Sequence, residues 1–219
     1  MYPETVLFDL DGTLLDTAPD FILVLNALRE EYGLGPLPNE IIRNTVSNGA
    51  RALVTLGFDV NEGDVNFETY REKLLKAYQS QLGQASCLFP GINNLLKKLE
   101  EKNIPWGVVT NKPSRFAIPL LETLALSQRC DVLICADQVT DAKPHPESLL
   151  KACKLVNAKP ENSIYIGDHK RDIEAGQRAN MTTITALFGY ISTEESPVSW
   201  RATYLAQSAD DIYNHIFNK

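Results

Sequence analysis

Two aspartates directly follow an apolar run near the start of the chain. Residues 6–8 are typical of a strand buried on both faces, and Asp9 and Asp11 come next, just before Gly12. One carboxylate can attack phosphorus and form an aspartyl-phosphate, and a second can protonate the departing alkoxide and later deprotonate water. Taken alone, the pair is equally consistent with a turn, because Asp and Gly favour turns.

Polar residues follow three further apolar runs in the same way. Thr110 and Asn111 follow residues 104–109, Lys143 comes after 132–135, and Asp168 and Asp172 follow 164–166. Separately, these residues could be a turn or helix cap, a surface lysine and the first turn of a helix. Since the carboxyl ends of parallel strands meet at one edge of a sheet, their joint occurrence indicates a single site.

Four carboxylates and one lysine would leave this site strongly negative. Close like charges raise one another's pKa unless a cation neutralises them. The candidate ligands are all oxygens, so the expected metal is Mg²⁺. The Thr110 hydroxyl, Lys143 and backbone N–H groups beyond Asp9 could then hold the phosphoryl oxygens, as phosphoryl transfer requires.

The hydrophobic pattern predicts an α/β fold with a doubly wound parallel sheet and an all-helical insertion after the first strand. Strands are expected at 6–8, 104–109, 132–135, 164–166, 182–186 and 203–205. Helices are expected at 21–32, 41–46, 50–56, 67–82, 90–102, 113–126, 146–156 and 171–179. The expected domains are a core of residues 1–15 and 87–219 and a helical cap of residues 16–86, placed over the ligand-binding edge of the sheet.

Composition excludes several classes of function. The chain has 219 residues and a formal net charge of −7, which disfavours nonspecific binding to nucleic acid or to an anionic membrane. It has no signal-like start and no long apolar run, so we expect a cytoplasmic protein. The spacing of the four cysteines matches neither a redox pair nor a zinc site, which favours reduced packing residues. Oligomeric state is not readable from the sequence.

At these motifs the sequence resembles the haloacid dehalogenase superfamily of phosphotransferases. The segments are "VLFDLDGT", "VVTN", "AKP" and "IYIGDHKRD", and the resemblance covers essentially the whole chain. It implies that Asp9 is the nucleophile and Asp11 the general acid/base. Thr110, with Asn111 beside it, and Lys143 would bind the phosphoryl group.

The same resemblance implies a Mg²⁺ site. Its ligands would be Asp9, the backbone carbonyl of Asp11 and Asp168, with Asp172 supporting the metal shell. It also implies that the helical insertion is a cap that closes over the site and excludes water. An acid at position 11 is typical of the phosphatases and phosphomutases. Two histidines, His145 and His169, lie beside motif residues, and the resemblance gives them no role.

The segment 44–58, "NTVSNGARALVTLGF", resembles the cap of phosphoglycolate phosphatases and, more closely, of bacterial N-acetylmuramic acid 6-phosphate phosphatases. Both substrates carry a carboxylate, so Arg51 is a candidate clamp for that anion; the alternative is an arginine on the solvated face of a short helix. The expected function is a Mg²⁺-dependent phosphatase of a small phosphorylated metabolite, linked to carbohydrate metabolism or peptidoglycan recycling. The alternatives are a phosphomutase and a phosphoacceptor signalling module.

Overall fold

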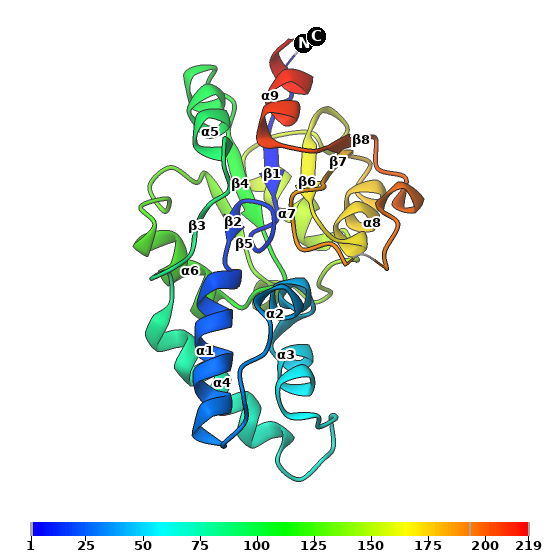
Figure 1. The fold of residues 1–219 in the computed structure, drawn as a ribbon. Coiled ribbons are helices and arrows are strands. Elements are labelled where there is room, and N and C mark those ends of the chain that lie inside the picture. The colour runs from blue at the N-terminus through cyan, green and yellow to red at the C-terminus, as the bar shows by residue number, and fades with distance from the viewer. Residues whose placement is uncertain (1, 193, 219) are drawn as a thin grey trace. The chain divides into compact units, whose positions relative to one another are not determined.

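The computed structural model describes residues 2–192 and 194–218. It contains two compact units, one formed by Met1–Leu15 with Leu88–Lys219 and the other by Asp16–Cys87 (Figure 1). The first unit holds the parallel sheet and the second is helical. The chain therefore leaves the first unit soon after the first strand and returns to it before the rest of the sheet is formed.

The first unit is built on a six-stranded sheet in the order β5-β4-β1-β6-β7-β8, and all neighbours pair in parallel. The strands are β1 (Val6–Phe8), β4 (Trp106–Val109), β5 (Val132–Ile134), β6 (Ile164–Gly167), β7 (Thr182–Ala186) and β8 (Tyr204–Ala206). Every residue of β1, β4 and β6 is buried, which explains why these strands are continuous apolar runs. The predicted α/β class is confirmed.

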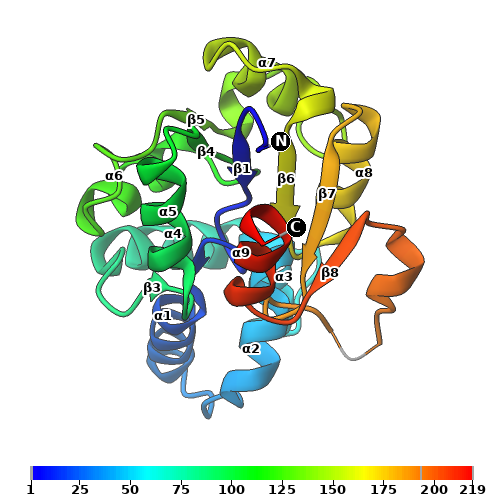
Figure 2. The same ribbon diagram turned by 90° about the horizontal axis from the view of Figure 1, so that it is seen from above.

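Helices cover both faces of this sheet, as Figure 2 shows. They are α5 (Ile92–Glu101), α6 (Ser114–Thr123), α7 (Glu147–Leu155), α8 (Lys170–Arg178) and α9 (Ala209–Phe217). Helix α7 packs against β4 and β5, and α8 against β6 and β7. Helices α5 and α9 contact each other on the opposite face. Helix α5 buries its residues at positions 92, 95, 96 and 99, the spacing of one helical face.

The strand register determines which residues meet at the carboxyl edge of the sheet. Phe8 of β1 lies level with Val108 of β4 and with Ile166 of β6. The residues that follow each of these three therefore emerge at the same edge. This places Asp9 beside the segments that lead to Thr110 and Asp168.

The second unit packs four helices around its own core: α1 (Ala18–Glu31), α2 (Asn39–Thr45), α3 (Gly49–Phe58) and α4 (Phe67–Gln81). Phe21 of α1 stacks on Tyr78 of α4 with ring centroids 3.9 Å apart. Asp20 of α1 is fully buried, and its carboxylate accepts hydrogen bonds from the backbone N–H groups of Gly83 and Ala85. The first helix of this unit is thereby tied to the segment that follows its last helix.

The structure adds elements that the sequence pattern did not predict. Two short strands, β2 (Leu15–Asp16) and β3 (Cys87–Leu88), form a separate two-stranded sheet. The sequence pattern also did not predict helix α9, although Ser208 caps this helix. The Ser208 Oγ accepts the Asp211 N–H at 3.2 Å, and the Asp211 carboxylate accepts the Ser208 N–H. The expected helices are all present, with ends that differ by up to three residues.

No helix within residues 2–192 and 194–218 combines the length and apolar character that a bilayer span needs. All four cysteines are free thiols. Cys135 and Cys153 are buried, as expected for packing residues, whereas Cys87 is exposed.

Candidate active site

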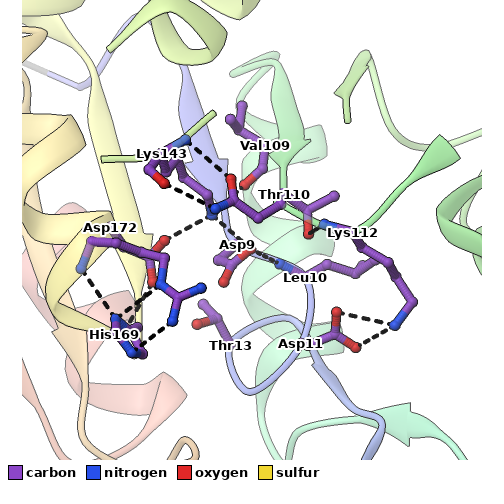
Figure 3. Close-up of polar contacts among 12 residues, drawn as sticks. Asp9, Leu10, Asp11, Thr13, Val109, Thr110, Lys112, Lys143, His169 and Asp172 are labelled. Atoms are coloured by element: carbon purple, nitrogen blue, oxygen red, sulfur yellow. Dashed lines mark hydrogen bonds and ion pairs between the residues drawn. The ribbon is translucent and has the colours of Figure 1, made fainter. Parts of the chain in front are cut away.

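The ammonium group of Lys143 lies at the centre of a buried ion-pair cluster (Figure 3). Its Nζ lies 2.8 Å from Oδ1 of Asp9 and 2.7 Å from Oδ1 of Asp172. It also donates hydrogen bonds to the hydroxyl of Tyr165 at 2.7 Å and to the carbonyl of Val109 at 3.0 Å. The side chains of Lys143 and Asp172 are 1% and 0% exposed, so protein oxygens take the place of water around this charge.

The backbone of Lys143 is held by Asn111. The side-chain amide of Asn111 donates to the carbonyl of Lys143 at 2.9 Å and accepts the Lys143 N–H at 3.1 Å. Thr110, the preceding residue, is 3% exposed, and its Oγ1 accepts the backbone N–H of Lys112 at 3.1 Å. The Asn111 side chain thus fixes the loop that carries the lysine.

Asp168 is held in a tight cradle at the end of β6. Its Oδ1 accepts the hydroxyl of Thr13 at 3.1 Å, and its Oδ2 accepts the backbone N–H of Tyr190 at 2.8 Å. A Cβ at Gly12, where φ is +82°, would lie 2.1 Å from Oδ2, and a Cβ at Gly189 would lie 2.3 Å from the Asp168 Cβ. Thr13, Gly189 and Tyr190 are contributors that the sequence analysis did not assign.

The carboxylates of this cluster are difficult to ionise together. Burial raises the pKa of Asp9 to about 6, although the Lys143 ammonium opposes the shift. Burial, followed by the charges of Asp9 and Asp172, raises the pKa of Asp168 to about 8. Burial alone would lower the pKa of Lys143, but the two carboxylates in contact with it outweigh burial and raise it. One ammonium therefore does not neutralise this group of acids.

A divalent cation fits this arrangement. Carboxylate oxygens of Asp9, Asp168 and Asp172 all lie within 4.8 Å of one another. The donor set consists only of oxygens, which suits a hard ion such as Mg²⁺. A bound cation would supply the positive charge that the raised pKa values of Asp9 and Asp168 show to be lacking.

Asp11 points away from this cluster and toward Lys112 (Figure 3). The Lys112 Nζ lies 2.9 Å from Oδ1 and 3.2 Å from Oδ2 of Asp11. The two side chains are 7% and 16% exposed. The two aspartates at the end of β1 therefore have different lysine partners, because Asp9 pairs with Lys143.

The two histidines near the motifs have structural partners. His169 Nδ1 accepts the backbone N–H of Arg171 at 3.2 Å and its side-chain Nε–H at 3.1 Å. Burial and the Arg171 guanidinium lower the pKa of His169 to about 4, so the ring is neutral at pH 7. His145 Nδ1 accepts the N–H of Glu147 at 3.3 Å.

A second group of potential metal ligands consists of Asp141, His145 and Glu147. Asp141 and His145 are exposed. Both carboxylate oxygens of Glu147 already accept backbone N–H groups, those of Thr140 and Asp141, at 3.0 Å each. This arrangement stabilises the loop before α7.

Arg51 lies on α3, in the second unit, where it forms an ion pair with Glu62. Both side chains are 57% exposed. Exposed ion pairs of this kind contribute only about 0–1 kcal/mol to stability, so the guanidinium can leave Glu62 at little cost in free energy.

Comparison with known proteins identifies the family. The family model described as "Haloacid dehalogenase-like hydrolase" matches residues 6–186. An N-acetylmuramic acid 6-phosphate phosphatase of Pseudomonas putida is 45% identical, with coverage of 91% of this chain and 89% of the relative. A phosphoglycolate phosphatase of Xanthomonas campestris pv. campestris is 38% identical, with coverage of 97% and 96%.

The fold also matches a crystal structure of a predicted phosphoglycolate phosphatase from Haemophilus somnus, with a TM-score of 0.85 at 22% identity and 97% coverage of both chains. The chain therefore belongs to the haloacid dehalogenase-like hydrolases. Within that family it is a phosphatase, a hydrolase of phosphoric monoesters.

The raised pKa values predict how a divalent cation affects stability. In metal-free protein, protonated Asp9 and Asp168 favour the folded state; this contribution is fully present below their ordinary pKa of 3.8 and falls as the pH rises, until it is lost above about 6 for Asp9 and about 8 for Asp168. A cation needs the ionised carboxylates and replaces the lost contribution. We expect Mg²⁺ to raise the Tm of chelator-treated protein more at pH 8 than at pH 6, measured by calorimetry. An equal shift at both pH values would contradict this.

Proposed function

We propose that this phosphatase transfers the phosphoryl group of its substrate to Asp9 and then to water. The observation that supports this best is the position of Asp9, whose carboxylate is held by Lys143 at the carboxyl edge of the sheet, beside Asp168. The backbone N–H of Leu10 donates to the same Asp9 oxygen as Lys143, Oδ1, at 2.8 Å. We therefore assign the attack on phosphorus to Oδ2.

In the first step, a bond forms between Asp9 Oδ2 and phosphorus, and the bond from phosphorus to the ester oxygen breaks. The carboxyl group of Asp11 gives its proton to the leaving oxygen, which departs as an alcohol. Lys143 and the Thr110 hydroxyl, with the backbone N–H of Asn111, hold the phosphoryl oxygens and offset their charge.

In the second step, water attacks phosphorus, and its proton passes to the Asp11 carboxylate. The bond between Asp9 and phosphorus breaks, which releases phosphate and restores the Asp9 carboxylate. We assign Mg²⁺ to Asp9, Asp168 and the backbone carbonyl of Asp11, with Asp172 supporting the metal shell. When bound, this ion supplies positive charge that screens the acids from an anionic substrate.

We propose that the substrate is a small phosphorylated acid of the phosphosugar or phosphoglycolate type. The relatives described above act on N-acetylmuramic acid 6-phosphate and on phosphoglycolate, and both of these compounds carry a carboxylate. The higher identity with the first favours N-acetylmuramic acid 6-phosphate and a cytoplasmic role in peptidoglycan recycling. The free thiols fit a reducing compartment.

We further propose that residues 16–86 act as a cap domain that selects the substrate. This segment nearly coincides with the helical unit Asp16–Cys87, which has its own core. Arg51 is our candidate for binding the substrate carboxylate, in exchange for its exposed pair with Glu62.

The nucleophile assignment predicts that Asp9→Asn abolishes hydrolysis of p-nitrophenyl phosphate, because an amide oxygen is a poor nucleophile. We expect a loss of at least about 10³-fold in kcat, together with dependence on Mg²⁺ in the wild-type protein. Phosphate release measured with a coupled assay tests both. Substantial turnover by Asp9→Asn, with folding verified by circular dichroism, would overturn the assignment.

Substrate selection is tested by kcat/KM for N-acetylmuramic acid 6-phosphate, 2-phosphoglycolate and glucose 6-phosphate. We expect the acidic substrates to be preferred, and Arg51→Ala to slow them about 10-fold while leaving the neutral sugar phosphate nearly unchanged. The matched control is Arg71→Ala, which removes an arginine that pairs with Glu68 in the same unit. Equal effects on acidic and neutral substrates would exclude the clamp.

A further inference from the structure

Lys112 is a mostly buried lysine of the first unit, and the sequence motifs assign it no role. Its Nζ contacts both carboxylate oxygens of Asp11, and its side chain is 7% exposed. In contrast, Lys98 and Lys170, which also pair with carboxylates, are 31% and 61% exposed. Exposed pairs are weak because water and salt screen them, whereas a two-oxygen contact with little solvent around it fixes a side chain firmly.

The backbone that carries Lys112 is itself fixed on both sides. Its N–H donates to Oγ1 of Thr110 at 3.1 Å. Just beyond Pro113, the N–H and Oγ–H groups of Ser114 bind the carboxylate of Asp137 at 2.9 and 2.5 Å, which anchors the start of α6. The ammonium is therefore presented from a rigid turn at the end of β4.

The backbone around Asp11 is held as well. The N–H of Gly12 donates to the carbonyl of Leu15 at 2.9 Å, and the N–H of Leu15 donates to the carbonyl of Leu10 at 2.9 Å. With the turn closed in this way, the main freedom left to Asp11 is rotation of its side chain. The contact with Lys112 restricts that rotation.

We propose that Lys112 is a positioning residue that, through its ion pair with the Asp11 carboxylate, sets the side-chain orientation from which Asp11, once protonated, gives its proton to the leaving-group oxygen. This inference rests on the proposed role of Asp11 as general acid. A proton donor must lie within hydrogen-bond reach of its acceptor, and misplacement by about 1 Å can cost on the order of 10²-fold in rate. Lys112 thus positions the proposed general acid, Asp11, whereas Lys143 positions the proposed nucleophile, Asp9.

Substrates with different leaving groups distinguish a positioning role of Lys112 from a purely structural one. An alkoxide must be protonated as it departs, but p-nitrophenolate leaves without a proton. The value of kcat/KM reports the steps up to loss of the leaving group, so the later attack by water does not contribute to it. A displaced Asp11 therefore lowers kcat/KM for an alkyl phosphate and not for p-nitrophenyl phosphate, whereas general damage to the site lowers both.

The experiment compares Lys112→Met, Lys112→Arg and Asp11→Asn with the wild type, using 2-phosphoglycolate or N-acetylmuramic acid 6-phosphate against p-nitrophenyl phosphate. For Lys112→Met we expect kcat/KM for the alkyl phosphate to fall about 10- to 100-fold and that for the aryl phosphate to change less than about 3-fold. Lys112→Arg retains the charge and restores most of the alkyl activity. Lys98→Met is the matched control, because it removes a lysine pair on α5.

Equal losses on both substrates, or no loss, would overturn the role of Lys112. The Asp11→Asn variant then shows whether the positioning role of Lys112 or the acid role of Asp11 has failed. If Asp11→Asn lowers kcat/KM only for the alkyl phosphate and Lys112→Met does not, Lys112 is not a positioning residue and the proposed function stands. If Asp11→Asn lowers kcat/KM equally for the alkyl and the aryl phosphate, the proposed role of Asp11 as general acid fails. Should Lys112→Met not fold, Lys112→Gln is measured against the same criteria.

Discussion

The burial of one ammonium group between two carboxylates is the constraint on which the site depends. Lys143 is almost fully enclosed, and its charge is compensated by Asp9 and Asp172, which come from different parts of the chain. Removing one partner from a buried ion pair typically costs about 3–5 kcal/mol, because the remaining charge has neither water nor a counterion. Stability and chemistry are therefore coupled at this point, since the lysine that ties the strand ends together also orients the proposed nucleophile.

This constraint accounts for the surrounding residues. Tyr165 points its hydroxyl at Lys143 and donates to the carbonyl of Val109 at 2.9 Å, so β6 and β4 are linked beneath the ammonium. Burial and the nearby carboxylates raise the pKa of Tyr165 well above its ordinary value, which keeps the phenol neutral. Asn111 uses its whole amide to hold the Lys143 backbone. Polar groups that would be costly alone are satisfied together.

Sequence reasoning reached the fold and the strand-end acids because both follow from simple rules. Apolar runs with helices between them specify a parallel sheet, and acids at several strand ends must converge. It did not reach Lys112, because its contact with Asp11 joins residues 101 positions apart and depends on a side-chain orientation. The roles of Gly189 and Tyr190 were missed for a similar reason, since they act through close backbone approach to Asp168. Helix α9 is different, because its cap, Ser208 with Asp211 three residues later, is a signal that the sequence itself carries.

The proposed mechanism requires that Asp9 becomes phosphorylated during turnover. It is tested most directly by quenching the enzyme with acid during steady-state hydrolysis, reducing it with borohydride, and locating the modified residue by mass spectrometry. Reduction converts an aspartyl-phosphate to homoserine, which fragment masses can assign to Asp9 or to Asp11. If Asp9 is the nucleophile, homoserine is expected at position 9, and only when substrate is present. Homoserine at Asp11, or none at all during rapid turnover, would contradict it.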